Sequence, residues 1–356
     1  MTAKNSKNER IKRAYFHHLR HAGGKSEQTI RQTGRSIARF EACTAQKDLK
    51  SFDQRQAVYF KDALAKTDLA AATIHSTLND LRRFFGWLAL QPGYKRAVRL
   101  TDIDYLSLSE KDTRAATAPA EKSFPTLQMV EKAIAAMPSE TAIEKRDRAM
   151  LAFTAITGIR DGALISLKLK HFDEARRLVL QNPREVNTKF SKRIDTFLFP
   201  LHDAFEAIFF EWVSYLRNEE LFGDHDPLFP KTAMGQDADQ CFMADGLSRE
   251  QWANATPVRK IFKDAFRHVG LPEFTPHLFR KMIVSEMYQR GLSVAECKAW
   301  SQNLGHEGAM TTLTSYGKIG LEEQGRLVRA ASTIDDKNNK PLTAQDLENI
   351  LRQRGF

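Results

Sequence analysis

The spacing of apolar residues in the first third of the chain constrains the fold most strongly. Between residues 13 and 110, apolar side chains recur at three- and four-residue intervals, and no segment alternates apolar and polar residues as a half-buried strand does. The pattern predicts a helical domain at residues 13–108, preceded by a flexible basic stretch at residues 1–12. The clearest helices are expected at Gln28–Cys43, Asp53–Lys66 and Ala72–Leu90.

The sequence texture changes after residue 108. Residues 109–123 lack apolar periodicity, which indicates an interdomain linker. Helical spacing returns in a second domain, expected at residues 124–330, and a C-terminal tail with a helix is expected at residues 331–356. In the second domain Thr126 is a candidate cap for a helix that extends to Met137. Further helices are expected near 143–156, 201–220, 256–269 and 276–290, and short strands at Leu178–Gln181 and Thr196–Phe199. The chain is therefore predicted to be mainly α, with a small β-sheet in its second domain.

Positive charge is concentrated at the start of the chain. The formal net charge is +10, and residues 1–110 hold 20 Lys and Arg against 11 Asp and Glu. Such a bias favours a polyanionic partner, because Lys and Arg displace counterions condensed on nucleic-acid phosphates. The candidate phosphate contacts are Arg31, Arg35 and Arg39, which share one helix face, and the adjacent Arg82 and Arg83. A solvated helix face explains the same spacing, so both interpretations stay open here.

Several common kinds of site are missing from the sequence. The three cysteines are widely separated and none lies in a C-x-x-C pair, so neither a disulfide framework nor a zinc site is expected. Gly23–Ser26 imitates the end of a phosphate-binding loop, but the earlier glycine of that motif is lacking. There is no H-E-x-x-H motif and no dense carboxylate cluster, while His17, His18 and His21 fit a basic helix surface better than a metal site. We expect no metal and no cofactor.

Three segments of the second domain carry residues suited to anion chemistry. In Thr157–Leu167 an apolar helix stops at a glycine, and Arg160 follows at the junction. In Thr275–Arg280 a helix starts at a proline, which places His277 and Arg280 on one face of the first turn, where the helix dipole favours an anion. The third segment, Leu304–Gly317, contains His306 and Tyr316.

Together these segments resemble the tyrosine recombinase, or phage integrase, family. The resemblance implies a two-domain C-shaped clamp, with a helical core-type DNA-binding domain and a catalytic domain. The family's two arginines match Arg160 and Arg280, its two histidines match His277 and His306, and its nucleophile matches Tyr316. Its catalytic lysine lies in a turn between two strands. Here that turn offers Lys189 as the first choice and Lys192 as the second.

Two positions depart from the family pattern. Many members carry an acidic residue three positions after the first arginine, where this chain has Ala163, and Asp161 stands beside Arg160 instead. Tyr316 follows His306 by ten residues, whereas nine is usual, which indicates a loop that is one residue longer. Neither departure removes a group that the chemistry requires, although Ala163 cannot supply the acid's buttressing role.

The resemblance implies a site-specific recombinase or integrase, of the kind carried by mobile genetic elements. Such an enzyme cleaves and rejoins DNA strands through a 3′-phosphotyrosine intermediate without metal or ATP. The resemblance also implies double-stranded recombination sites as partners, a homotetramer assembled on DNA, and accessory DNA-bending proteins. The tail after Ala331 would dock on a neighbouring subunit through the apolar residues Leu347, Ile350 and Leu351.

Two other functions fit the same motifs. One is a DNA-binding protein that has kept the fold without cutting DNA, and the other is a type IB topoisomerase or hairpin telomere resolvase with the same catalytic residues. No apolar run approaches the roughly 18 residues of a membrane span, and Met1–Arg13 lacks the apolar core of a signal peptide. We therefore expect no membrane partner and a cytoplasmic, nucleoid-associated protein.

Overall fold

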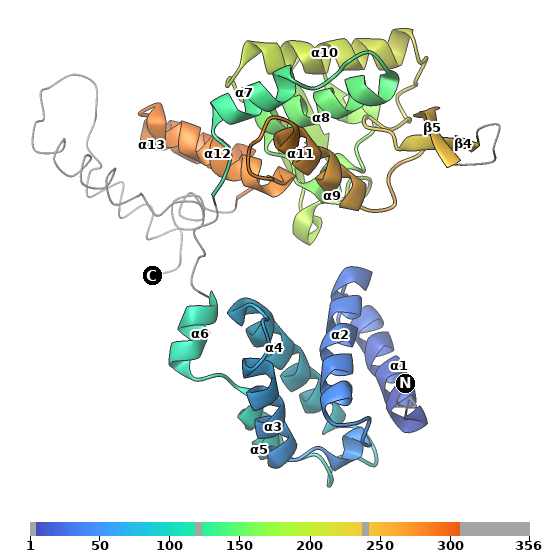
Figure 1. Ribbon diagram of the computed structural model, residues 1–356, viewed down its shortest axis with the longest axis vertical. Coiled ribbons are helices and arrows are strands. Elements are labelled where there is room, and N and C mark those ends of the chain that lie inside the picture. Colours follow the sequence, from blue (N-terminus) through green and yellow to red (C-terminus); the bar gives the residue numbers. More distant parts are fainter. Residues whose placement is uncertain (1–4, 118–122, 237–241, 307–356) are drawn as a thin grey trace, which may run out of the picture. The chain divides into compact units, whose positions relative to one another are not determined.

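Two separate hydrophobic cores organise the chain, which divides into units at residues 1–121 and 122–356 (Figure 1). The computed structural model describes residues 5–117, 123–236 and 242–306. The described part of the first unit is entirely helical, and that of the second combines helices with small antiparallel sheets. The predicted mainly α fold with a small β-sheet is confirmed.

The first unit is a bundle built around aromatic side chains. Phe52 stacks on Phe85 with ring centroids 3.8 Å apart, and Phe40 meets Phe60 and Phe85 edge-on at 5.2 Å. Aromatic side chains bury large apolar areas, so this cluster supplies much of the core. The three helices expected from the apolar spacing are present, with ends within two residues of the predicted ones. The elements are α1 (Ser6–His21), α2 (Glu27–Cys43), α3 (Gln54–Ala65), α4 (Ala71–Leu88), α5 (Leu100–Ile103) and α6 (Glu110–Thr117).

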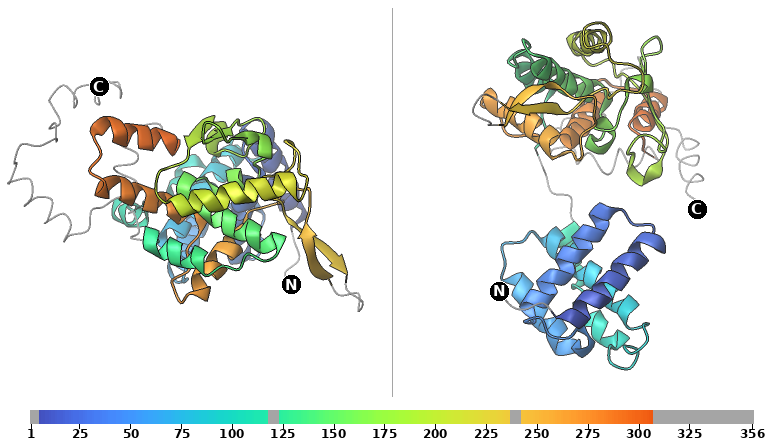
Figure 2. Two further views of the ribbon diagram at one scale, coloured as in Figure 1. Left: turned by 90° about the horizontal axis from the view of Figure 1, so that it is seen from above. Right: turned by 90° about the vertical axis from the view of Figure 1, so that its right-hand side faces the viewer.

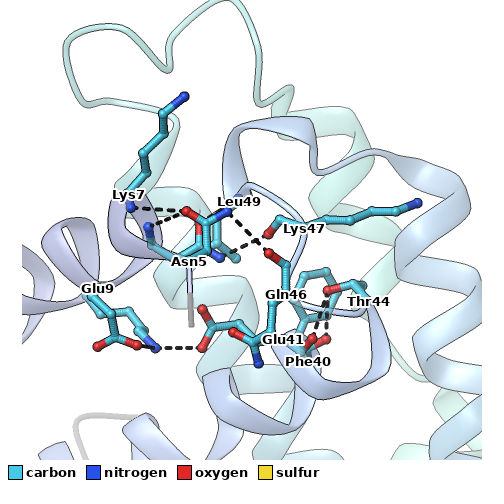
Figure 3. A network of polar contacts seen from close by, with 11 residues as sticks. Asn5, Lys7, Glu9, Phe40, Glu41, Thr44, Gln46, Lys47 and Leu49 are labelled. Atoms are coloured by element: carbon cyan, nitrogen blue, oxygen red, sulfur yellow. Dashed lines mark hydrogen bonds and ion pairs between the residues drawn. The ribbon is translucent and has the colours of Figure 1, made fainter. Parts of the chain in front are cut away.

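The N-terminal stretch expected to be flexible is instead anchored from Asn5 onward. The Asn5 side chain caps α1 by accepting from the backbone N–H of Lys7 at 3.0 Å (Figure 3). Asn8 is buried and donates to the Lys47 carbonyl at 2.9 Å, while the Lys12 ammonium pairs with the buried Glu41 carboxylate at 2.6 Å. These polar contacts hold the start of α1 in place. The segment contains too few apolar residues for their spacing to predict a helix there.

The segment expected as a linker also begins with ordered structure. Glu110–Thr117 form α6, which packs against α4 and buries Ala116. Because α6 has eight residues and buries only Ala116, its sequence shows no clear apolar periodicity. The division between the two units falls after Glu121, within the predicted linker.

In the second unit, helices pack around α8 (Ala142–Thr157). Every residue from Ala149 to Thr157 is buried, as expected for a helix covered on all sides. Thr141 and Glu144 form a capping box at its start, and α10 (Asp203–Asn218) packs along it. The remaining helices are α7 (Leu127–Ala135), α9 (Asp161–Leu164), α11 (Thr256–His268), α12 (Pro276–Gln289) and α13 (Val294–Asn303).

Two small antiparallel sheets accompany these helices. The first has the order β1-β2-β3, formed by Phe172–Asp173, Leu178–Gln181 and Ile194–Phe197, with Leu178 opposite Phe197. Strand β2 lies where predicted, whereas β3 begins two residues earlier than expected. The second sheet, a hairpin of β4 (Thr232–Gln236) and β5 (Phe242–Leu247), was not predicted and stands out from the helices of its unit (Figure 2). The turn between β2 and β3 carries both candidate lysines.

None of the helices in the described parts of the chain is long and apolar enough to span a bilayer. The predicted tail, including its helix and Leu347, Ile350 and Leu351, lies outside the described residues.

Candidate active site

Arg280 joins the three motif segments. It lies in the first turns of α12 with only 2% of its surface exposed. Its Nη1 donates to the Gly158 carbonyl at 2.6 Å, and its Nη2 donates to the Leu304 carbonyl at 2.5 Å. Nη2 also lies 2.9 Å from Nε2 of His306. Residues separated by as many as 122 positions in the chain therefore meet at one buried guanidinium.

Gly158 allows this approach. It ends α8 in the left-handed conformation, with φ 58° and ψ 26°. A Cβ atom at this position would lie 2.7 Å from Cδ2 of Leu304 and 2.8 Å from Cδ1 of Ile283. Both the backbone angle and the lack of space call for glycine, which explains why the apolar helix stops there.

Arg160 lies just beyond this helix end. It precedes α9 in an extended conformation (φ −77°, ψ 145°) and is half-buried. Its positive charge lowers the pKa of both His277 and His306. Arg160, Arg280 and the two histidines therefore form one electrostatic cluster.

The surroundings of His277 disfavour its charged form. Burial is the main cause that lowers its pKa below 6.5, and the charges of Arg280, Arg160 and Lys189 lower it further. The Asp161 carboxylate acts in the opposite direction. A neutral imidazole near neutral pH can accept a proton.

His306 is 9% exposed, and burial together with the two arginines lowers its pKa to about 4. An arginine can only donate, so Nε2 of His306 accepts from Arg280 and the ring proton of the neutral imidazole resides on Nδ1.

The candidate lysine turn is strained and lies near this cluster. Phe190 and Ser191 both have positive φ, 62° and 52°, and the Phe190 ring is 76% exposed. The Lys189 ammonium lies 4.9 Å from the centre of that ring, and the Lys192 ammonium lies 5.7 Å from it. The charge of Lys189 is among the causes that lower the pKa of His277, so Lys189 lies within electrostatic reach of the cluster.

Ser166 links this turn to the segment that carries Arg160. Its hydroxyl accepts the backbone N–H of Asn187 at 2.8 Å and donates to the Gly162 carbonyl at 3.1 Å. Glu185 lies in the same β2–β3 turn. Nε2 of the buried His171 lies 2.7 Å from its carboxylate, and this contact is the main cause that lowers the pKa of Glu185 to about 2. Sequence reasoning missed these supporting residues. Ser166 belongs to the first motif, but its partner Asn187 lies 21 residues further along the chain, in the β2–β3 turn.

Asn303 is a second support that was not predicted. Its amide accepts from the backbone N–H of Phe197 at 2.7 Å and donates to the carbonyl of the same residue at 2.9 Å. The side chain thus pairs with edge strand β3 as a neighbouring strand would, and this fixes the end of α13 just before Leu304 and His306.

The arginines expected to contact DNA lie on two helices that pack together, α2 and α4. Arg31 and Arg35 are exposed on α2, whereas Arg39 is half-buried and donates to the Thr77 hydroxyl at 3.2 Å. The structure also places Arg82 and Arg83 at exposed positions of α4. Tyr316, the predicted nucleophile, lies outside the described residues.

Comparison with known proteins supports the resemblance to the phage integrase family. The sequence profile of the phage integrase family matches residues 126–319, and that of the phage integrase N-terminal SAM-like domain matches residues 13–91. A tyrosine recombinase XerC from Bifidobacterium longum (strain DJO10A) is 27% identical over 218 residues, which are 59% of this chain and 55% of that protein. The chain therefore spans about half the length of this curated relative.

Solved structures show the same fold at low identity. A lambda integrase(75-356) dimer bound to a COC′ core site matches with a TM-score of 0.61 and 16% identity, covering 93% of this chain and 99% of that one. The Tn1549 transposon integrase in complex with transposon right end DNA gives a TM-score of 0.58 at 14% identity, covering 91% and 99%. A XerH site-specific recombinase bound to palindromic difH substrate gives 0.56 at 16% identity, covering 86% and 80%.

The fold is thus that of the integrases and site-specific recombinases. Since the family profile covers more than half of the sequence, the chain belongs to the phage integrase family.

Proposed function

We propose that this protein is a site-specific DNA recombinase that breaks and rejoins strands through a 3′-phosphotyrosine at Tyr316, without metal or ATP. The observation that carries the proposal is one electrostatic cluster, in which His306 contacts the buried Arg280 and the charges of Arg160 and Arg280 act on both His277 and His306. Four potential donors in one partly water-excluded cluster suit a phosphodiester, whose negative charge increases as a nucleophile attacks.

The two arginines would bind the non-bridging oxygens of the scissile phosphate. Guanidinium groups donate paired hydrogen bonds that match phosphate geometry, and their charge offsets the repulsion between the phosphate and an oxygen nucleophile. His306 would add a donor through Nδ1, the nitrogen that carries its proton.

Two proton transfers accompany strand cleavage, and we assign them to His277 and Lys189. A free tyrosine titrates near pH 10, so Tyr316 needs a base, and His277 is neutral and able to accept its proton. As the bond from the Tyr316 oxygen to phosphorus forms, the bond from phosphorus to the 5′-oxygen breaks, and Lys189 donates a proton to that oxygen. One ester replaces another, so strand rejoining by a 5′-hydroxyl needs no external energy.

The remaining assignments concern DNA and assembly. We assign DNA-backbone contacts to the helical domain at residues 13–108, through Arg31, Arg35, Arg39, Arg82 and Arg83, and catalysis to residues 124–330. Exchange between two duplexes requires four active subunits, so the proposal includes a homotetramer on double-stranded recombination sites, with the tail at residues 331–356 docked on a neighbour. Accessory DNA-bending proteins and a cytoplasmic, nucleoid-associated location complete the proposal.

The test is covalent trapping on a nicked suicide DNA substrate that carries the cognate core site. The wild-type protein should form a denaturation-resistant complex with the 3′ end of the cut strand, and Tyr316→Phe should bind DNA without forming it. Tyr288→Phe is the matched control, because this tyrosine of α12 is 41% exposed and lies in the same unit. Specific binding of cognate DNA by the wild type without any covalent product would overturn the proposal.

A further inference from the structure

An ion pair links the first catalytic motif to α11. Asp161 directly follows Arg160 and is the first residue of α9. Its Oδ2 lies 2.6 Å from Nε and 2.5 Å from Nη2 of Arg259, and its Oδ1 accepts the backbone N–H of Gly162 at 2.9 Å. Oδ2 is therefore bound by a residue of α11 and Oδ1 by a residue of α9, two helices whose labels lie next to one another in Figure 1.

This carboxylate stands within a group of cations. The pKa of His277 is lowered by Arg280 and Arg160, on α12 and at the start of α9, and by Lys189 in the β2–β3 turn, whereas Asp161 raises it. A carboxylate within electrostatic reach of this cluster would compete with a phosphate for the same arginines unless another cation neutralised it.

The position three residues after Arg160, where many family members carry an acid, provides no carboxylate in this chain. Ala163, three residues after Arg160, is 1% exposed and packs in the hydrophobic core. Asp161 cannot take over that buried position, because its carboxylate is held by Arg259 at the partly exposed surface of the unit.

We infer that Arg259 is a positioning residue of the active site, which holds the Asp161 carboxylate and thereby keeps it from pairing with the phosphate-binding arginines. The inference rests on the proposed function. Arg259 touches Asp161 and acts through it, so it is not itself a catalytic residue. An ion pair whose side chains are 27% and 47% exposed adds little to stability, which leaves the charge arrangement as its main effect.

The experiment compares Arg259→Gln, Asp161→Asn and the double variant, with Arg267→Gln as the matched control. Arg267 is on the same helix, is similarly exposed, and pairs with Asp264 and Glu273 rather than with a residue of the first motif. The readouts are the rate of covalent complex formation at saturating suicide DNA, DNA affinity, and the His277 titration followed by NMR in the protein without DNA.

Arg259→Gln should slow covalent complex formation about tenfold at saturating DNA, since small misplacements of catalytic groups have effects of this size or larger. DNA affinity should change little. The pKa of His277 should rise, because the Asp161 charge is no longer neutralised, and the acidic limb of the pH–rate profile should move to higher pH. Adding Asp161→Asn should recover most of the rate and reverse the titration shift, since a neutral amide needs no counter-charge. Arg267→Gln should match the wild type.

The inference is overturned if Arg259→Gln behaves like Arg267→Gln, or if the double variant stays as slow as Arg259→Gln. A main effect on DNA affinity would also overturn it, because Arg259 would then contact DNA directly. If the wild type forms no covalent complex, the proposed function fails instead, and the His277 titration in the free protein still decides whether Arg259 controls the Asp161 charge.

Discussion

Replacing Gly158 with alanine tests the packing that assembles the site. Three effects combine in the free energy of unfolding. A left-handed conformation costs a non-glycine residue roughly 1–2 kcal/mol. The new Cβ would lie 2.7 Å and 2.8 Å from buried side chains of Leu304 and Ile283, and such overpacking costs about 1–3 kcal/mol. A stiffer unfolded chain offsets about 0.4–1 kcal/mol of this.

The expected net loss is about 1–5 kcal/mol, with a midpoint of about 3 kcal/mol, measured by denaturant unfolding of the purified protein. Gly270→Ala is the matched control, because Gly270 has φ 73° in the same unit and a Cβ there would meet no atom within 4 Å. It should show the backbone strain alone, about 1 kcal/mol. Equal losses in the two variants would refute the close approach at Gly158. Gly158→Ala should also slow covalent complex formation, because the Gly158 carbonyl binds Arg280.

The other predictions concern the surrounding groups. His306 should titrate near pH 4 by NMR in the folded protein, well below its usual pKa of 6.5. Its contribution to the free energy of unfolding is therefore complete above pH 6.5 and is lost as the pH falls toward 4. Titration near pH 6.5 would contradict the buried contact with Arg280. Asn303→Ala should lower the free energy of unfolding by about 0.5–1.5 kcal/mol, because the N–H and C=O of Phe197 exchange their bonds to Asn303 for bonds to water at this exposed edge, whereas an unchanged denaturation midpoint would rule out the edge-strand role. Lys189→Ala should be inactive on ordinary DNA and recover on DNA with a 5′-bridging phosphorothiolate, whose leaving group needs no proton; rescue of Lys192→Ala instead would transfer the general-acid role to that lysine.

Local signals predicted much of the fold. Thr126 was expected to cap a helix, and its hydroxyl accepts the backbone N–H of Met129 at 3.2 Å. Helices with a strong apolar face were placed well for the same reason, since the face and the caps are encoded within a few residues. Helix α13 was missed because Ser301 is its only fully buried residue, and the β4–β5 hairpin because Met234 and Met243 are exposed, which removes the alternation that marks a strand.

The site was predictable as a set of residues but not as a geometry. The motif order singled out Arg160, His277, Arg280 and His306, and the structure brings these four into one cluster. The contacts that hold the cluster together depend on carbonyls and side chains whose partners are remote in sequence. Periodicity and spacing carry no information about such pairs, and the bond between Asp161 and Arg259, 98 residues apart, is an example.

The central claim is that Tyr316 forms a covalent bond to the 3′-phosphate of cleaved DNA. Trapping the complex on suicide DNA, trimming the DNA with nuclease and digesting the protein should yield one peptide that carries nucleotide mass, and fragmentation should place that mass on Tyr316. A nucleotide attached to any other residue, or linked through a 5′-phosphate, would contradict the account.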